Sequence, residues 1–457
     1  MQKNNINNDT ICALATATGG AIGIIRLSGN RSIEIVNKIF SKNISNAKPN
    51  SLHYGEIIRK YNDCIDIIDD VVISIYHTPH SYTGEDSVEI SCHGSSYILN
   101  KVLELLIDNG CRMALPGEYT QRAFMNGKMD LSQAEAVSDL ISSTNQATHR
   151  IAMSQLRGCF SSELAQLREK LLKLTSLLEL ELDFSDHEDL EFADRTELLS
   201  IANAIYEQIC KLINSFKTGK ALKQGIPVAI VGKTNVGKST LLNQLLKDER
   251  AIVSNIHGTT RDVIEDTIDI NGVIFRFIDT AGIRNTEDEI EKLGIERTYK
   301  KIKEASIIIW LIDERPSNYD INEILELTKG KQLIVVQNKI DLNSNIENET
   351  WSCPKVFISA KHNKNIDLLE KHIYKAANIP VIKENNIIVT NTRHYEALKR
   401  AKTNINRVIE GLNTNNSGDL IAEDLRLALA DLAEITGGQI TTQETLSNIF
   451  SNFCVGK

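Results

Sequence analysis

The sequence has no excess of positive charge and no segment that resembles an export signal or a membrane span. Its 60 Asp and Glu residues outnumber its 51 Lys and Arg residues, which gives a net charge of -9. Such a chain has no general attraction to nucleic acid, so any RNA contact must come from a local patch or a partner, and no DNA partner is expected. The opening MQKNNINNDTICALAT lacks a basic segment followed by an apolar run. We expect a cytoplasmic protein without membrane contact.

The eight cysteines lack the spacing typical of zinc sites or disulfide frameworks. No two of them form a Cys-x-x-Cys pair. This pattern suits the reduced thiols of a cytosolic protein. Cys92 and His93 are adjacent, which is the wrong spacing for a structural zinc pair. We interpret them as a buried strand thiol followed by a histidine in a turn.

Glycine and proline nearly vanish between about residues 118 and 216, where apolar residues fall at helical spacing. Five leucines follow a step of three or four residues that places them on one seam of a helix: Leu164, Leu167, Leu171, Leu174 and Leu178. We interpret this stripe as core rather than as a ligand site. The stretch 215–227 then breaks the pattern, so a helix end is expected there.

The regions on either side of this helical stretch have different patterns of apolar and polar residues. VVISIY (71–76) and SVEISCHG (87–94) have the length and pattern of strands, and residues 95–110 predict a helix that ends at Gly110. Between about 225 and 380, apolar strands alternate with helices, as in a doubly wound α/β domain. Helical periodicity returns after Pro380. We therefore expect an α+β N-terminal domain (1–118), a discontinuous helical domain (119–220 and 381–457) and an inserted α/β domain (221–380).

A phosphate-binding loop follows the first strand of the inserted domain. GKTNVGKS (232–239) lies between the strand PVAIV and the helix STLLNQLL. In this spacing, backbone N–H groups turn inward around phosphate oxygens, Lys238 reaches the outer phosphates and the Ser239 hydroxyl binds Mg²⁺. The domain is therefore predicted to be a P-loop GTPase domain of the Ras-like type, provided that the base is guanine.

Further motifs follow in order and identify the base. Thr260 in GTTRD has the hydroxyl for a second Mg²⁺ contact, and DTAG (279–282) can hold the magnesium shell and meet the γ-phosphate. Asp341 in NKID can accept two hydrogen bonds from guanine, whereas adenine would leave that carboxylate unpaired. SAK (359–361) closes the base site. The sequence predicts a domain that binds and hydrolyses GTP.

The usual catalytic glutamine is absent after DTAG, where Ile283 stands. Asn235 and the carbonyls of SNIHGT (254–259) can instead cage a large monovalent cation in place of an arginine finger. The alternative for Asn235 is a turn-forming residue with a left-handed backbone. Several carboxylates in TEDEIEKLG (286–294) can hold the attacking water, and the residues alone do not choose among them.

These motifs, together with SYTGEDSVE, PGEYTQRAFMNGKMDLSQAEAVSDLI and the terminal FCVGK, resemble the MnmE (TrmE) family of tRNA modification GTPases over essentially the whole chain. The resemblance implies a potassium-activated GTPase that forms homodimers, and an N-terminal domain that binds 5-formyl- or 5,10-methylene-tetrahydrofolate. It also implies a heterotetramer with the FAD-dependent protein MnmG. Together they would install an aminomethyl or carboxymethylaminomethyl group on C5 of the wobble uridine of certain tRNAs.

The resemblance also implies roles for individual residues. The folate contacts match Arg26, Glu89, Lys128 and Lys457, and Cys454 would lie near the transferred carbon. The potassium ligands match Asn235, Ser254, Ile256 and Thr259, the magnesium ligands match Ser239 and Thr260, and the catalytic residues match Glu291, which orients the water, and Lys238. The GTP-binding residues are Asn235, Val236, Gly237, Lys238, Ser239, Thr240, Ser254, Thr259, Thr260, Asp279, Thr280, Ala281, Gly282, Asn338, Lys339, Asp341, Ser359, Ala360 and Lys361.

The main alternative is a ribosome-assembly or RNA-binding switch GTPase. Such a protein would carry an appended RNA-binding fold, often basic, and no basic patch is visible in the sequence. The chain also shows no flavin-binding fingerprint of its own, so the uridine chemistry is expected to be shared with the partner.

Overall fold

The structure is a computed structural model. It describes residues 9–61, 64–183, 195–247, 266–278, 302–342, 353–379, 387–414, 416–438, 446, 449–451, 453 and 456. The chain divides into two compact units, the first made of Met1–Ile141, Gln155–Glu169 and Arg426–Lys457, the second of Ser142–Ser154 and Lys170–Leu425. No helix in these described ranges is long and apolar enough to cross a membrane.

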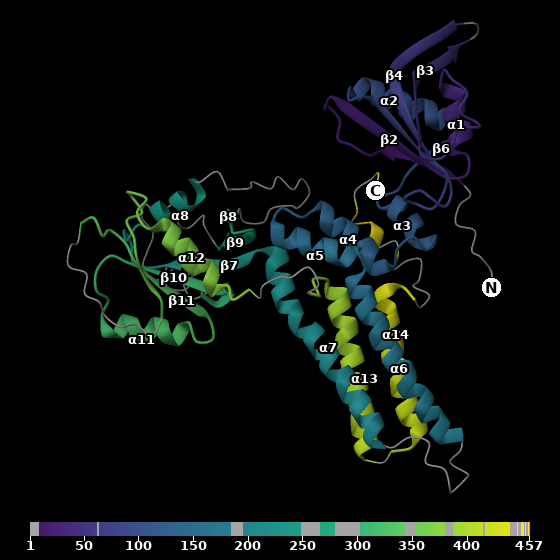
Figure 1. Ribbon diagram of the computed structural model, residues 1–457. Coiled ribbons are helices and arrows are strands. Elements are labelled where there is room, and N and C mark those ends of the chain that lie inside the picture. The colour runs from purple at the N-terminus through teal and green to yellow at the C-terminus, as the bar shows by residue number, and fades with distance from the viewer. Residues whose placement is uncertain are drawn as a thin grey trace. The chain divides into compact units, whose positions relative to one another are not determined.

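The first unit contains a six-stranded sheet of order β3-β4-β5-β2-β1-β6 (Figure 1). The strands are β1 (Thr10–Leu14), β2 (Ile22–Ser28), β3 (Ser51–Tyr61), β4 (Cys64–Tyr76), β5 (Ser87–His93) and β6 (Cys111–Met113). All neighbours are antiparallel except β1 and β6. The strands expected at 71–76 and 87–94 are confirmed, and His93 is the last residue of β5 rather than a turn residue.

Two helices cover one face of this sheet because its strands alternate buried and exposed positions. Helices α1 (Ser32–Ile39) and α2 (Ser96–Asp108) pack on the buried side chains of β2, β4 and β5 to form one hydrophobic core. As expected, α2 ends at a glycine, Gly110, with φ of 103°. The other face of the sheet bears the polar side chains described below.

Seven long or short helices of the described residues belong to the expected helical domain or lead into it. They are α3 (Glu118–Met125), α4 (Leu131–Ile141), α5 (Gln146–Leu156), α6 (Cys159–Asp183), α7 (Arg195–Gln224), α13 (Thr392–Asn413) and α14 (Gly418–Thr436). The leucine stripe expected to be core lies on α6, and all five of its members are buried. Helices α7 and α13, far apart in sequence, lie side by side (Figure 1).

The helix end expected within 215–227 is confirmed: α7 continues to Gln224 and ends at Gly225, whose φ is 83°. Gly219 does not interrupt the helix but permits a close contact: a Cβ there would lie 2.2 Å from the carbonyl oxygen of Val389. The glycine therefore serves the packing of α7 on the segment that leads into α13.

The second unit contains a six-stranded sheet of order β12-β11-β10-β7-β9-β8. Its strands are β7 (Ile226–Val231), β8 (Asp266–Ile270), β9 (Val273–Phe277), β10 (Ile307–Ile312), β11 (Gln332–Gln337) and β12 (Lys355–Phe357), and its helices include α8 (Lys238–Lys247), α11 (Asn318–Leu327) and α12 (Ile366–Ala376). Only the β8–β9 pair is antiparallel. All six residues of β10 are buried, as in a strand covered on both faces. The predicted fold class, α+β, helical and inserted α/β, is confirmed.

Candidate functional site

The phosphate loop joins β7 to α8 and depends on two glycines. A Cβ on Gly232 would lie 2.3 Å from the carbonyl oxygen of Leu311, and one on Gly237 would lie 2.4 Å from Nδ2 of Asn338. Gly237 also has a φ of 98°, which favours glycine. The loop therefore runs so close to β10 and to the NKID segment that side chains at these two positions do not fit.

Lys238 is held across the loop that precedes it. Its Nζ donates to the carbonyl oxygens of Gly232 at 2.8 Å and Lys233 at 2.6 Å. Ser239 and Thr240 follow in the first turn of α8, where backbone N–H groups have no partner inside the helix. A positive side chain and a helix N-terminus thus meet at one point, which is the arrangement that binds phosphate.

Asn338 connects the phosphate loop to the SAK segment. Its Nδ2 donates to the carbonyl oxygen of Val236 at 2.8 Å, and its Oδ1 accepts from the backbone N–H of Ala360 at 3.0 Å. Its side chain is buried, so both bonds form away from water. Motifs that lie about 100 residues apart are thereby held as one unit.

Asp341 is oriented by the same SAK segment. Its Oδ1 accepts from the Ser359 hydroxyl at 2.6 Å, and this bond is the main reason that the pKa of Asp341 is lowered. The carboxylate is therefore ionised at neutral pH and can accept hydrogen bonds. Lys339 has a φ of 61°, and its Nζ lies 2.7 Å from Oδ2 of Asp313. Lys361, the last residue of the SAK segment, is exposed.

Asn235 has a φ of 63° and is exposed in the loop. The positive φ fits the turn-forming alternative, and the exposed amide leaves its oxygen accessible. Several other predicted site residues lie outside the described residues: Ser254, Ile256, Thr259, Thr260, Asp279, Thr280, Ala281, Gly282, Glu291, Cys454 and Lys457, as do His257 and Ile283.

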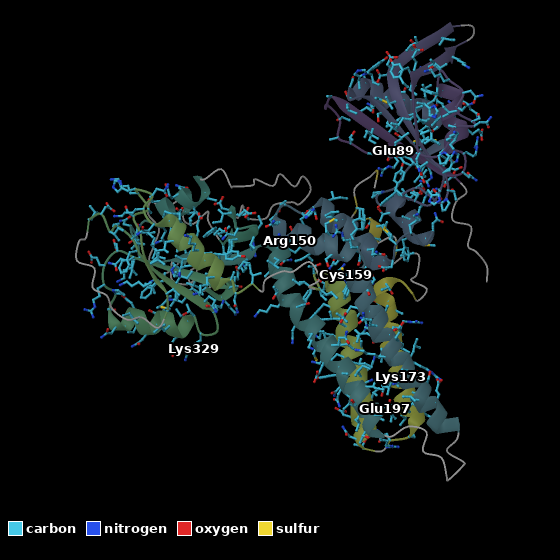
Figure 2. All side chains as sticks on the ribbon, viewed as in Figure 1. Glu89, Arg150, Cys159, Lys173, Glu197 and Lys329 are labelled. Atoms are coloured by element: carbon cyan, nitrogen blue, oxygen red, sulfur yellow. The ribbon has the colours of Figure 1, made fainter. Side chains whose placement is uncertain are left out.

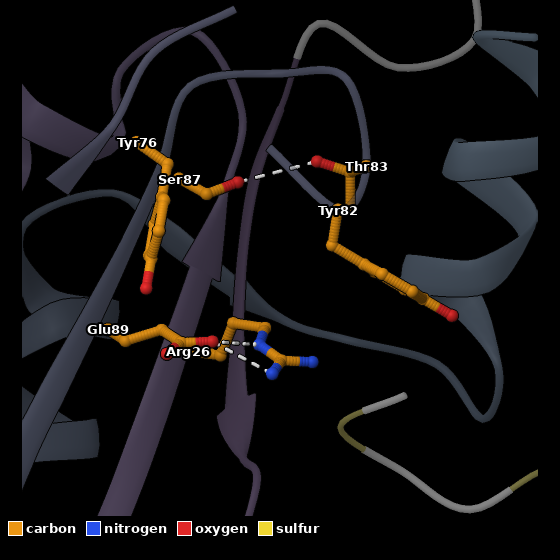
Figure 3. A pocket seen from close by; sticks show the side chains of 6 residues that line it. All are labelled: Arg26, Tyr76, Tyr82, Thr83, Ser87 and Glu89. Carbon is orange, nitrogen blue, oxygen red and sulfur yellow. Dashed lines mark hydrogen bonds and ion pairs between the residues drawn. The ribbon is translucent and has the colours of Figure 1, made fainter. Parts of the chain in front are cut away.

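A polar pocket of about 240 Å³ lies on the open face of the first sheet (Figure 3). It is lined by Arg26, Tyr76, Tyr82, Thr83, Ser87 and Glu89. Arg26 on β2 stands directly opposite Glu89 on β5, and its Nε and Nη2 each lie 2.8 Å from Oε1 of Glu89. The guanidinium carbon is 5.8 Å from the ring centres of both Tyr82 and Tyr119. A paired cation and anion between aromatic rings suits a flat, hydrogen-bonding ligand.

The end of the chain lies beside this pocket. Nη1 of Arg26 donates to the carbonyl oxygen of Gly456 at 3.4 Å. A Cβ on Gly456 would lie 2.1 Å from the carbonyl oxygen of Leu14, so the tail runs against the end of β1. Phe453 is buried and packs on Phe450, which anchors the tail. Lys128 does not line the pocket but donates to the carbonyl oxygen of Pro79 at 3.0 Å, in the segment that carries Tyr82.

The structure also shows a buried ion network that the sequence analysis did not find. Arg122, only 4% exposed in its side chain, contacts Asp9, Glu85 and Glu118, and Arg112 contacts Asp9 and Glu118. Burial favours a higher pKa for Glu118, but the hydrogen bonds from Arg112, the backbone and Arg122 hold it below its usual value. The only hint of this network in the sequence is the i, i+4 spacing of Glu118 and Arg122, which places the two side chains on one face of a helix.

This network reaches the pocket through hydroxyl groups. Oγ of Ser28 donates to Oε2 of Glu85 at 2.7 Å and lies 2.7 Å from Oγ1 of Thr83. Thr83 is one of the pocket residues. The position of Thr83 in the pocket thus depends on hydrogen bonds that lead through Ser28 to Glu85 of the ion network.

Comparisons with known proteins agree with this arrangement. Residues 10–128 match the family model described as GTP-binding protein TrmE N-terminus, and residues 131–454 match the MnmE helical domain. Proteins named tRNA modification GTPase MnmE are 55% identical in Phocaeicola vulgatus (99% of each chain covered) and 54% identical in Bacteroides thetaiotaomicron (99% of this chain, 100% of the relative). The relative from Flavobacterium johnsoniae is 49% identical with the same coverage of 99% and 100%. The chain belongs to the MnmE family of tRNA modification GTPases.

Proposed function

We propose that this chain is a potassium-activated GTPase that works with the FAD-dependent protein MnmG on the wobble uridine of certain tRNAs. As a member of the MnmE family it is a GTP hydrolase that acts in tRNA modification. The finer statement is that the two proteins install an aminomethyl or carboxymethylaminomethyl group on C5 of that uridine. The observation that carries the GTPase part is the double hydrogen bond of Asn338, which joins the phosphate loop to the SAK segment.

Within this proposal, the described loop residues bind and orient the nucleotide. The ammonium of Lys238 exchanges its loop carbonyls for phosphate oxygens, and the amides of Val236 to Thr240 surround the same oxygens. The Ser239 hydroxyl, with Thr260, would hold Mg²⁺. Asp341 would accept hydrogen bonds from guanine. Residues 279–282 would hold the magnesium shell and contact the γ-phosphate. Glu291 would orient the attacking water.

Potassium is proposed as the activating ion because the chain has Ile283 where a water-orienting glutamine is usual and presents the exposed amide of Asn235 in the loop. Ser254, Ile256 and Thr259 would complete the ligand set. The bound ion would supply positive charge beside the transferring phosphate. The test compares GTP hydrolysis in KCl and NaCl at equal ionic strength. We expect a strongly faster rate in KCl, and equal rates would refute the cation proposal.

We also propose that the pocket at Arg26 and Glu89 binds a reduced folate, either 5-formyl- or 5,10-methylene-tetrahydrofolate, with Lys128 and Lys457 as further contacts. Its polar groups fit the pterin, since a carboxylate can accept from the pterin amino edge and a guanidinium can donate to its carbonyl oxygen. The volume of about 240 Å³ is below the roughly 300 Å³ of common ligand pockets, so we expect only the pterin end to enter. Cys454 would lie near the transferred carbon.

The proposed assembly is a homodimer that joins MnmG in a heterotetramer and acts on tRNA in the cytoplasm. The domain division at 118, 220 and 380 belongs to the same proposal. Loss of the modified wobble nucleosides in cells that lack this chain would support the whole scheme, and an unchanged nucleoside profile would refute it. Family membership favours the role in tRNA modification over the ribosome-assembly alternative.

A further inference from the structure

The helix pair α7 and α13 carries a net positive charge although the chain as a whole is acidic. The chain as a whole carries a net charge of -9. Helix α13 nevertheless has five Lys and Arg residues and two Glu residues, and α7 has the same five and two. The remainder of the chain is therefore more acidic still. A polyanion that meets this protein is repelled by most of its surface and attracted to this pair of helices.

A groove between the two helices brings part of this charge together. It has a volume of about 660 Å³ and is lined by Tyr206, Ile213, Tyr395, Lys399, Lys402, Thr403, Asn406, Arg407 and Glu410. The lining residues of α13 recur every three or four positions, so they form one face of the helix. From Tyr395 to Arg407 this face extends about 18 Å, at roughly 1.5 Å per residue.

Aromatic rings hold the two lysines of the groove in place. Nζ of Lys402 lies 5.2 Å from the ring centre of Tyr206, and Nζ of Lys399 lies 5.6 Å from that of Tyr395. The ring of Tyr395 is itself stacked on Phe216 of α7, with 4.2 Å between ring centres. The two ammonium groups are therefore held beside rings, and Lys402 also interacts with the Cys210 thiol and the Tyr206 hydroxyl, which raise its pKa. An ammonium has three N–H donors, so donors remain for an anion.

Carboxylates lie near the C-terminal end of the groove on α13 and reduce its positive charge there. Oε1 of Glu410 accepts from Nδ2 of Asn406 at 2.7 Å, and Nη1 of Arg407 lies 3.7 Å from Oδ1 of Asp424 on α14. Lys399 and Lys402 have no such carboxylate partner among the ion pairs found in the described residues. The groove thus presents two ammonium groups about one helical turn apart, with hydroxyl and amide groups beside them.

We propose that this groove between α7 and α13 binds the phosphate backbone of RNA, and that it is a docking surface for the tRNA substrate. The inference rests on the proposed function for the identity of the RNA. An open groove with separated cations fits a polyanion better than a single small anion, which needs convergent donors. Binding through phosphates positions an RNA without reading its sequence, which suits a surface remote from the modified base.

The test is tRNA binding by the full-length protein, measured by fluorescence anisotropy over a series of salt concentrations. The groove variant is Lys399→Gln with Lys402→Gln. The control is Lys173→Gln with Lys329→Gln, two exposed lysines away from the groove that Figure 2 labels. Both double variants lose the same charge. A general electrostatic effect would therefore appear equally in both.

We expect the groove variant to bind tRNA at least about fivefold more weakly and to reduce the slope of log affinity against log salt by about one to two, because each lysine contributes about one phosphate contact. The control should keep both the affinity and the slope of the unmodified protein. Tyr206→Phe loses the hydroxyl contact but keeps the ring beneath Lys402, so it should bind more tightly than Tyr206→Leu. Tyr206→Leu should weaken binding, because the ammonium is no longer held.

Equal affinity and slope in the groove and control variants would overturn the inference. So would a groove variant that keeps tRNA binding but loses binding to the FAD-dependent partner, because the groove would then be a protein-docking surface. GTP hydrolysis is measured in the same preparations and should not change, since these residues are outside the nucleotide site. If the unmodified protein binds tRNA but cells without the chain keep their wobble nucleosides, the proposed function fails and the groove remains an RNA site.

Discussion

The guanidinium of Arg26 lies 3.4 Å from the carbonyl oxygen of Gly456, a residue 430 positions further along the chain. The same guanidinium pairs with Glu89 through Nε and Nη2. One side chain therefore joins two strands of the N-terminal sheet to the end of the chain. Arg26 also lines the pocket, so the affinity of a ligand that contacts Arg26 should depend on the position of the tail.

The first prediction concerns this arginine. Arg26→Lys keeps the charge but cannot contact Glu89 and Gly456 together, because an ammonium lacks the planar fork. We expect tetrahydrofolate affinity to fall by about ten- to a hundredfold, the value of one or two hydrogen bonds to charged groups, when measured by calorimetry. The matched control is Arg31→Lys, just before α1, because Arg31 contacts Glu34 through two nitrogens at 3.2 and 3.3 Å but lies outside the pocket. Equal affinities in the two variants would remove Arg26 from the folate site.

The second prediction concerns the tail. Gly456 has a φ of 95°, and an added Cβ would lie 2.1 Å from a carbonyl oxygen, so Gly456→Ala must displace the tail. We expect folate affinity to fall by about tenfold or more while guanine-nucleotide affinity stays the same. Gly330→Ala is the control, because Gly330 also has a positive φ, 77°, but nothing lies within 4 Å of the added Cβ. If both variants bind folate as the unmodified protein does, the tail plays no part in the pocket.

The third prediction separates the two interpretations of Asn235. Asn235→Gly keeps the left-handed turn at φ of 63° and removes the amide oxygen. If the amide binds potassium, the KCl-dependent rate should fall by about a hundredfold, the effect of removing one preorganised electrostatic group. Affinity for GDP should change little. A glycine variant that retains full stimulation by potassium would show that Asn235 only forms the turn.

The fourth prediction tests the base. Asp341→Asn replaces an acceptor with a donor at the guanine edge, while the hydrogen bond from Ser359 can still form. GTP affinity should fall by about a hundredfold or more, because the N–H groups of the base lose their partner, and xanthosine triphosphate should become the better ligand. Nucleotide competition experiments measure both effects. Undiminished GTP affinity would mean that the base site is assigned wrongly.

The fifth prediction concerns the buried ion network. Arg122→Met leaves the carboxylates of Asp9, Glu85 and Glu118 without their central cation, so we expect the free energy of unfolding to fall by about 3–5 kcal/mol at neutral pH. Chemical denaturation measures this value. Arg31→Met, which removes an exposed arginine just before α1, is the control and should leave the value nearly unchanged.

The pH dependence of this loss follows from the sign of the pKa shifts. Burial acts to raise the pKa values of Asp9 and Glu118, but hydrogen bonds from the arginines hold both below their usual values. Their contribution to stability is therefore present above about pH 4 and is lost as the pH falls through the lower values of the folded state. Without Arg122 the carboxylates are easier to protonate. The difference between variant and unmodified protein should therefore shrink as the pH falls below about 4, and a constant difference would contradict this account.

Much of the fold was accessible from the sequence because its signals are local. The strands at 71–76 and 87–94, the helix that ends at Gly110 and the leucine stripe of α6 all follow from periodicity. The helix end expected within 215–227 lies near the end of that range, at Gln224, because Gly219 does not interrupt α7 but permits a close contact with Val389. Local propensity cannot report a neighbour that lies 170 residues away.

The sequence by itself determined the nucleotide motifs and the family, because the spacing of a phosphate loop and of NKID is dictated by the shape of the ligand. Only the tertiary structure decided that Asn338 joins loop and base segment, that Arg26 meets Glu89 and the tail, that Arg122 is surrounded by acids, and that two helices far apart in sequence form one basic groove. Each of these depends on side chains that converge from distant positions. Such convergence is a property of packing, and no short stretch of the chain encodes it.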